Sequence, residues 1–255
     1  MKIAIIGGTG LERMALDHAE VLTVETRWGA PSGPIIKGDM KGQTVFFLNR
    51  HGPEHTIPPH CINYRANIAA LHQLGVDAVV AINAVGGITQ TMGAGVLVVP
   101  DQLIDYTWGR EFTYIDCVDT ALEHMDFTFP YHGGMRKALL SAAARCGMKL
   151  FDSGVYGVVQ GPRLETAAEI VRLERDGCDL VGMTGMPEAA LARELDIPYA
   201  CLALVVNPAA GKSLDPITVA QIREVMESSI PRLKCLLVSL CEHPPNLGNH
   251  RYSSG

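Results

Sequence analysis

Three short segments combine glycines with side chains that can hold a small anion. They are Gly7-Gly8-Thr9-Gly10, Asn49-Arg50-His51-Gly52 and Gly182-Met183-Thr184-Gly185, and the first two follow apolar runs of strand length. The third stands just before Pro187, a residue type favoured at the first position of a helix. Glycine turns with exposed amides, an arginine fork and a helix amino terminus all suit an oxyanion. Together the segments favour a phosphate site, although the first alone is as typical of a tight turn and the second of a strand-end arginine–carboxylate pair.

The spacing of the glycines, histidines and serines does not match the motifs of other common active sites. A dinucleotide-binding loop starting at Gly8 needs glycine at position 13, where the chain has Arg13, and no GxxxxGK[ST] sequence occurs. His51, His55 and His60 stand in a proline-rich stretch that cannot place them on one helical face, so we expect no metal there. No GxSxG surrounds a serine. These observations disfavour an NAD-binding oxidoreductase, a metalloenzyme and a serine hydrolase.

Two polar residues at the ends of strand-like runs could face an organic ligand. Glu165 lies between the run 154–159 and a helical pattern, and Asn207 ends the apolar run 199–206. Glu165 is equally typical of an acid in the first turn of a helix, and Asn207 of a turn residue. The residues alone leave both interpretations open.

The segments between these motifs alternate between strand-like and helix-like patterns. Short apolar runs end in glycine or asparagine loops, and helical spacing follows at 63–74, 135–146 and 218–240. This order predicts an α/β fold, with a single domain over residues 1–243, a central mixed β-sheet and flanking helices. Ligands in such folds bind at the carboxyl ends of the strands, where these motifs fall. Residues 106–131 are predicted to form a long loop, and 244–255 a disordered tail.

Composition narrows the class of protein further. The 255 residues include 21 basic and 27 acidic side chains, for a net charge of −6, and no lysine–arginine run offers a nucleic-acid footprint. No apolar stretch is long enough to span a membrane. The 7 cysteines are scattered without a CxxC spacing, which predicts reduced thiols and a cytoplasmic location.

The order of motifs along the chain resembles the trimeric purine nucleoside phosphorylase and methylthioadenosine phosphorylase family, from residue 2 to about residue 241. The motifs that carry the resemblance are IIGGTG at the start, NRHG at 49–52, NYRANI at 63–68, NAVGG at 83–87, QGPRLET at 160–166, GMTGMPEA at 182–189 and VVNPAAG at 205–211. The resemblance implies a homotrimer that cleaves a purine N-glycosidic bond by reversible phosphorolysis. Phosphate would be a co-substrate, with no metal and no organic cofactor.

The resemblance also implies roles for individual residues. The catalytic residues would be Asn207, His51 and Arg50, and the amide of Asn207 could accept from purine N7–H and donate to O6. Each subunit would receive His124 from its neighbour, close to the 5' group of the nucleoside. The implied phosphate site comprises Thr9, Arg50, His51, Thr184 and the backbone at Asn83 and Ala84; Met183 would lie under the ribose; and Leu164, Glu165, Asn207, Pro208 and Ala209 would line the base site.

Three positions bear on which nucleoside is cleaved. Asn207 and Glu165 match the 6-oxopurine pattern of the family, whereas methylthioadenosine enzymes carry aspartates and a serine there. Val219 presents an apolar wall where hydroxyl-binding relatives have histidine, which favours a 5'-methylthio group. The implied reaction converts methylthioinosine to hypoxanthine and 5-methylthioribose 1-phosphate. Inosine or guanosine phosphorolysis and methylthioadenosine phosphorolysis are the alternatives within the family, and a non-catalytic nucleoside-binding module is the alternative outside it.

Overall fold

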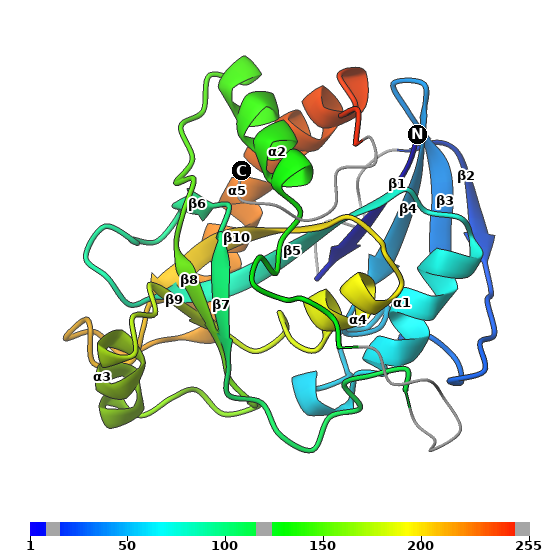
Figure 1. The fold of residues 1–255 in the computed structure, drawn as a ribbon. Coiled ribbons are helices and arrows are strands. Elements are labelled where there is room, and N and C mark those ends of the chain that lie inside the picture. Colours follow the sequence, from blue (N-terminus) through cyan, green and yellow to red (C-terminus); the bar gives the residue numbers. More distant parts are fainter. Residues whose placement is uncertain (9–15, 116–123, 248–255) are drawn as a thin grey trace.

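The computed structural model describes residues 1–8, 16–115 and 124–247, which form a single domain with a mixed β-sheet between two layers of helices (Figure 1). The sheet has ten strands, and β2-β3-β4-β1-β5-β9-β8-β7 is the order of eight of them, while β10 pairs with β5 and β6. The strands are β1 Lys2–Gly7, β2 Asp17–Leu22, β3 Ile35–Met40, β4 Gln43–Asn49, β5 Ala78–Gly87, β6 Leu97–Val98, β7 Gln102–Asp105, β8 Val155–Val158, β9 Leu180–Gly182 and β10 Tyr199–Pro208. The predicted α/β fold is confirmed.

Four central strands run in one direction. Strand β1 pairs in parallel with β4 and with β5, and β10 pairs in parallel with β5. Because parallel strands end at the same edge of a sheet, the segments that follow them gather at one place. Strand β5 is nearly all buried and consists of small and β-branched residues, as expected for a strand covered on both faces.

The helices begin where side chains can satisfy the free amides of the first turn. Asn63 accepts from the amide of Ala66 at the start of α1, and Thr166 forms a capping box with Glu169 at the start of α3. Within the described ranges the α-helices are α1 Tyr64–Gln73, α2 Gly133–Arg145, α3 Ala167–Arg175, α4 Glu188–Glu194 and α5 Val219–Glu242, with a short 3₁₀ turn at Pro59–Cys61. None of the helices in the described ranges has the length and apolar character needed to cross a membrane.

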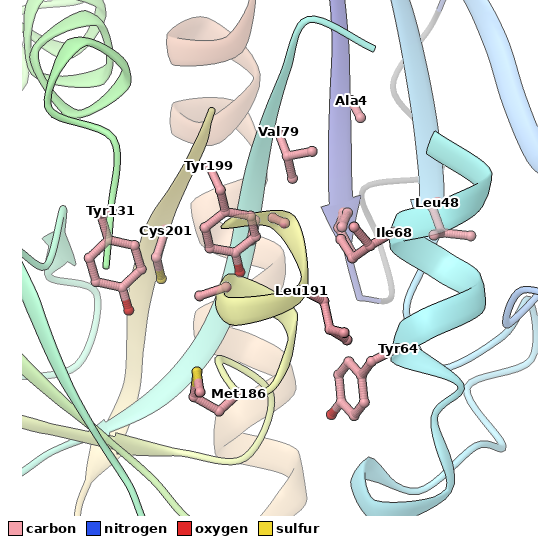
Figure 2. Packing of buried hydrophobic residues seen from close by; sticks show 14 of the residues in the cluster. Ala4, Leu48, Tyr64, Ile68, Val79, Tyr131, Met186, Leu191, Tyr199 and Cys201 are labelled. Atoms are coloured by element: carbon pink, nitrogen blue, oxygen red, sulfur yellow. The ribbon is translucent and has the colours of Figure 1, made fainter. Parts of the chain in front are cut away.

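Alternation along the strands separates the core into two layers. Ala4 and Val79 face the side covered by α1 and α4, and Figure 2 shows them with Ile68 and Leu191 of these helices. Their strand neighbours, such as Ile5, face the other side and pack with buried residues of α2 and α5. The period of two along each strand thus lets one sheet bury two sets of helices.

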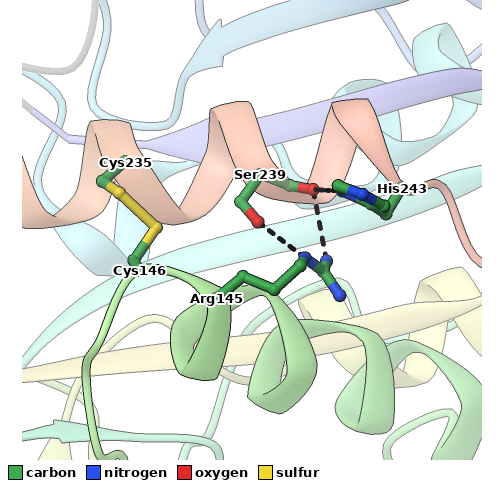
Figure 3. The surroundings of a disulfide bond; sticks show 5 residues. All are labelled: Arg145, Cys146, Cys235, Ser239 and His243. Atoms are coloured by element: carbon green, nitrogen blue, oxygen red, sulfur yellow. Dashed lines mark hydrogen bonds between the residues drawn. A yellow bond between two sulfur atoms is a disulfide. The ribbon is translucent and has the colours of Figure 1, made fainter.

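A disulfide corrects one expectation from the sequence. Cys146, at the carboxyl end of α2, is bonded to Cys235 of α5, with Cα atoms 6.2 Å apart (Figure 3). The expectation that all cysteines are reduced is therefore wrong for this pair. The two residues are 89 positions apart and meet only because α2 packs on α5, so their spacing gave no signal. Cys61, Cys178, Cys201 and Cys241 are free thiols.

The disulfide lowers the number of cysteines that can be alkylated without prior reduction. Alkylation of the unfolded, unreduced protein should label at most five of the 7 cysteines, because Cys146 and Cys235 are protected as a pair. Intact-mass spectrometry before and after reduction measures the number of labels. The Cys235→Ser variant is the matched control, since it should expose one additional thiol at Cys146. Labelling of all cysteines in protein purified without reductant would contradict the pairing.

Candidate active site

The predicted anion-binding segments meet at the carboxyl edge of the parallel strands. The amide of Arg50 donates to the carbonyl of Gly7 at 2.9 Å, which holds the segment after β4 beside the end of β1. Ala84 is the one exposed residue within the otherwise buried strand β5. The edge therefore opens to solvent beside Asn83 and Ala84. Thr9 lies outside the described residues, so its implied role stays a prediction.

Arg50 and Glu188 form a buried ion pair under this edge. Nε and one terminal nitrogen of Arg50 donate to the two carboxylate oxygens of Glu188 at 2.7 and 2.8 Å, and both residues are at most 1% exposed. The Tyr199 hydroxyl donates to Glu188 at 2.9 Å, and the other terminal nitrogen of Arg50 donates to the carbonyl of Ile82 at 3.1 Å. Burial opposes the charged form, but Glu188 outweighs it, so the pKa of Arg50 is raised.

The sequence left two interpretations of Arg50, an anion-binding residue and a partner in a strand-end arginine–carboxylate pair. A guanidinium carries five N–H groups. The contacts with Glu188 and Ile82 use three of them, which leaves one N–H on each terminal nitrogen outside these contacts. The structure thus shows a strand-end arginine–carboxylate pair, and the implied role of Arg50 in binding phosphate stays a prediction.

A short hydrogen-bond relay orients Thr184. The Asn83 side-chain amide donates to Thr184 Oγ1 at 2.7 Å, and the thiol of Cys201 donates to Asn83 Oδ1 at 3.3 Å. Since Thr184 Oγ1 accepts from Asn83, its own proton can serve as a hydrogen-bond donor. All three side chains are buried, so packing holds the hydrogen-bonded groups in place.

The glycines around Thr184 are required by close packing. A Cβ at Gly182 would lie 2.6 Å from the hydroxyl of Tyr156, and one at Gly185 would lie 2.8 Å from a ring carbon of Tyr156. Both distances are shorter than any normal contact. The glycines let the loop press on the Tyr156 ring, and this places the Thr184 hydroxyl close to Asn83.

His51 is neutral in the free site. Its Nδ1 lies 2.8 Å from the carbonyl of Ile57, to which it donates, so Nε2 holds the lone pair. Burial lowers the pKa of His51 to about 4, against a weaker opposing effect of the Ile57 carbonyl. The centroid of the ring lies 4.6 Å from that of His55, and the two ring planes are tilted by 47°. A neutral Nε2 can accept a proton or a hydrogen bond from a protonated phosphate oxygen.

Asn207 lies at a β-bulge near the end of β10. The register shifts between Val205 and Asn207, which then pairs with Gly86 of β5. Bulges re-aim side chains and occur beside active sites. One Asn207 Nδ2 proton goes to the carbonyl of Pro208 at 2.7 Å, which leaves the second proton and Oδ1 for a ligand.

Glu165 is not the acid of a helix first turn. The amino-terminal cap of α3 is Thr166, and Glu169 fills the first-turn position, so Glu165 stands before the helix. Its side chain is partly buried, and this burial raises the pKa of Glu165. The structure thus excludes the first-turn interpretation of Glu165, and its implied contact with a ligand stays a prediction.

The other implied substrate residues lie at or near the surface of the single chain. Leu164 is 46% exposed and Val219 is 65% exposed, while Met183 is partly buried. His124 and Pro208 are exposed, and Ala209 is buried. Exposed positions such as Leu164, Val219 and His124 are accessible to a ligand or to another subunit.

Sequence reasoning missed four side chains that organise this site: Glu188, Tyr199, Tyr156 and Arg110. Glu188 stood in the quoted motif GMTGMPEA, but an acid at the start of a helix is usually explained by the helix dipole. The buried tyrosines gave no signal distinct from core residues. Arg110 fell in the segment that was expected to be an irregular loop.

Comparison with known proteins places the chain in a family. The family model for the phosphorylase superfamily matches residues 2–242, so the chain belongs to this superfamily. The resemblance inferred from the motifs is confirmed at this level.

Individual relatives cover most of the chain. The sequence is 54% identical to a probable S-methyl-5'-thioinosine phosphorylase of Pseudomonas syringae pv. tomato, over 92% of this chain and 96% of that protein. It is 44% identical to the 6-oxopurine nucleoside phosphorylase of Pyrococcus furiosus, over 89% of this chain and 86% of that protein. The solved structure of methylthioadenosine phosphorylase from Schistosoma mansoni with adenine matches with a TM-score of 0.89 at 31% identity, covering 94% and 91% of the two chains.

The lowered pKa of His51 gives the protein a defined response to acid. In the folded chain His51 binds a proton only near pH 4, whereas in the unfolded chain it does so near pH 6.5. The free energy of unfolding should therefore fall as the pH is lowered through this window. Urea unfolding at about pH 7 and about pH 5 measures the loss, and His51→Asn should show a smaller loss than the wild type. The exposed His72 supplies the control: His72→Asn should keep the wild-type loss, and an equal loss in His51→Asn would refute the assignment.

Proposed function

We propose that this protein catalyses the phosphorolysis of S-methyl-5'-thioinosine to hypoxanthine and 5-methylthioribose 1-phosphate. The observation that carries the proposal is the layout of strand β5. Asn83 of this strand binds Thr184 on the anion side, and Gly86 pairs with Asn207 on the base side. Three residues of a strand span roughly 10 Å. This spacing suits a ribose between a phosphate and a purine.

The chemistry needs both sides of this site at once. Phosphate attacks the anomeric carbon while the bond to purine N9 breaks, and the sugar gains positive charge between the two. Arg50 and the Thr184 hydroxyl would hold the dianion beside this charge, so that attack needs little further ordering. The bond electrons move onto the purine, N7 takes a proton from solvent water, and Asn207 Oδ1 would accept a hydrogen bond from the N7–H so formed. Phosphate is the co-substrate, and the proposal includes no metal or organic cofactor.

Base choice in the proposal rests on Asn207 and Glu165. The free N–H of Asn207 can donate to O6 of hypoxanthine, and the Glu165 carboxylate can accept from its N1–H. The 6-amino group of adenine would instead face the N–H donor of Asn207, and its unprotonated N1 would face the acceptor oxygens of the Glu165 carboxylate. Each buried mismatch costs roughly 1–3 kcal/mol, so two mismatches exclude the aminopurine strongly. The names of relatives such as the Pseudomonas syringae protein support the same substrate.

The 5' side and the assembly complete the proposal. Val219 begins α5 and leaves an exposed apolar surface for a methylthio group. Trp108 and Phe112, at 72% and 67% exposed, offer apolar surface of the kind that subunit interfaces cover. We propose a cytoplasmic homotrimer in which His124 of one subunit reaches the site of the next.

Inosine or guanosine phosphorolysis is the second candidate function, favoured by the likeness to the Pyrococcus furiosus protein.

Turnover of methylthioinosine, methylthioadenosine and inosine, each with and without phosphate, tests this function. Base release should require phosphate, and kcat/KM should be highest for methylthioinosine. Methylthioadenosine should be lower by a factor on the order of 1,000, because both base contacts fail. Inosine should be lower by a factor of about 10–100, since an apolar pocket rejects a hydroxyl only modestly.

The variant Asn207→Asp should narrow the gap between the two methylthio substrates, chiefly by slowing the 6-oxopurine reaction. Asn246→Asp, which makes the same change on the carboxyl-terminal segment after α5, is the matched control and should leave the ratio unchanged. Equal or better cleavage of methylthioadenosine by the wild type would refute the roles of Asn207 and Glu165. Binding of nucleoside without phosphate-dependent turnover would instead indicate a non-catalytic module.

A further inference from the structure

Arg110 is a buried arginine that makes hydrogen bonds to carbonyl groups rather than to a carboxylate. Its side chain is only 7% exposed. One terminal nitrogen donates to the carbonyls of Met183 at 2.8 Å and Met186 at 2.6 Å, and to the Tyr64 hydroxyl at 3.1 Å. The other donates to the carbonyls of Val159 at 3.3 Å and Gln160 at 2.9 Å, while Nε donates to Gln160 Oε1 at 3.2 Å.

These acceptors belong to three separate parts of the chain. Val159 and Gln160 begin the loop that leads from β8 to Glu165. Met183 and Met186 flank Thr184 in the loop between β9 and α4. Tyr64 opens α1, and its ring lies 5.4 Å from the Arg110 guanidinium carbon. Figure 2 shows Tyr64 and Met186 among the buried side chains next to α4.

A single guanidinium therefore fixes the distance between two loops with different tasks. The loop at 159–165 ends at the proposed base contact, and the loop at 183–186 carries the ribose and phosphate contacts. Direct packing adds to this link, because a Cβ at Gly161 would lie 2.5 Å from the sulfur of Met183. A planar fork reaches several acceptors in fixed directions, which the ammonium of lysine cannot do.

We propose that Arg110 is a positioning residue that sets the separation of the base loop from the ribose–phosphate loop, and that it thereby determines base discrimination. This inference rests on the proposed function, because it assigns the two loops to the base and to the sugar. This role requires no contact between Arg110 and the substrate or the reacting atoms. Its effect passes through the backbone of Gln160 and Met183.

The test compares Arg110→Lys and Arg110→Met with the wild type. Arg110→Met should lower kcat/KM for methylthioinosine by about 100-fold, since a small misplacement of binding groups has that effect. The preference for methylthioinosine over methylthioadenosine should fall by about 10-fold or more, because Glu165 no longer faces N1 at the right distance. Arg110→Lys should recover part of the rate and less of the preference.

Arg136 provides the matched control. It also binds backbone carbonyls, those of Val99, Pro100 and Asp152, but it does so on helix α2. Arg136→Met should lower thermal stability and leave the substrate preference unchanged. If Arg110→Met and Arg110→Lys both keep the wild-type preference within about twofold, the positioning role is refuted.

A second measurement separates this inference from the proposed function and does not depend on turnover. In folded Arg110→Lys, backbone amides of 159–165 and 183–186 should exchange hydrogen faster than in the wild type, while those of β1 should not change. If the wild type cleaves no nucleoside, the proposed function fails and the exchange data still decide whether Arg110 holds both loops. Unchanged exchange in both loops would overturn the inference.

Discussion

The buried ion pair between Arg50 and Glu188 is the interaction on which the rest of the site depends. Removing one partner of such a pair costs about 3–5 kcal/mol, because an uncompensated charge stays behind. The pair joins the segment after β4 to the first turn of α4, and Tyr199 of β10 binds the same carboxylate. It also neutralises most of the charge that an anion would otherwise meet. In the proposed function, anion binding at this edge would therefore depend on hydrogen bonds directed by Arg50 and Thr184 more than on net positive charge.

The parallel strands convert this local pair into a site with two sides. Strand β5 lies between β1 and β10, so its carboxyl end meets the anion-binding segments on one side and the bulge at Asn207 on the other. The glycines of the loop at 182–185 serve the same arrangement, because only a backbone without side chains can lie so close to Tyr156. The strands thus set the distance between the Thr184 side and the Asn207 side of the site. Arg110 sets the distance between the loops at 159–165 and 183–186.

The sequence predicted the features that depend on local patterns. Glycine-rich segments singled out Arg50 and Thr184, the end of an apolar run singled out Asn207, and the apolar runs predicted the α/β architecture. Features that depend on partners far along the chain could not be predicted. Glu188 lies 138 residues from Arg50, and the disulfide joins positions 89 apart. The strands β7 and β9 have only 4 and 3 residues, too few to show alternation, and they form because β8 pairs with both.

The most direct test of this account is the phosphate dependence of base release by Arg50→Lys. Lysine keeps the positive charge and loses the planar fork, so the variant separates charge from direction. The account predicts a folded enzyme whose KM for phosphate rises by about 10–100-fold, with a much smaller change in KM for the nucleoside. A wild-type KM for phosphate in folded Arg50→Lys would contradict the central claim that directed hydrogen bonds from Arg50, held by Glu188, bind the anion.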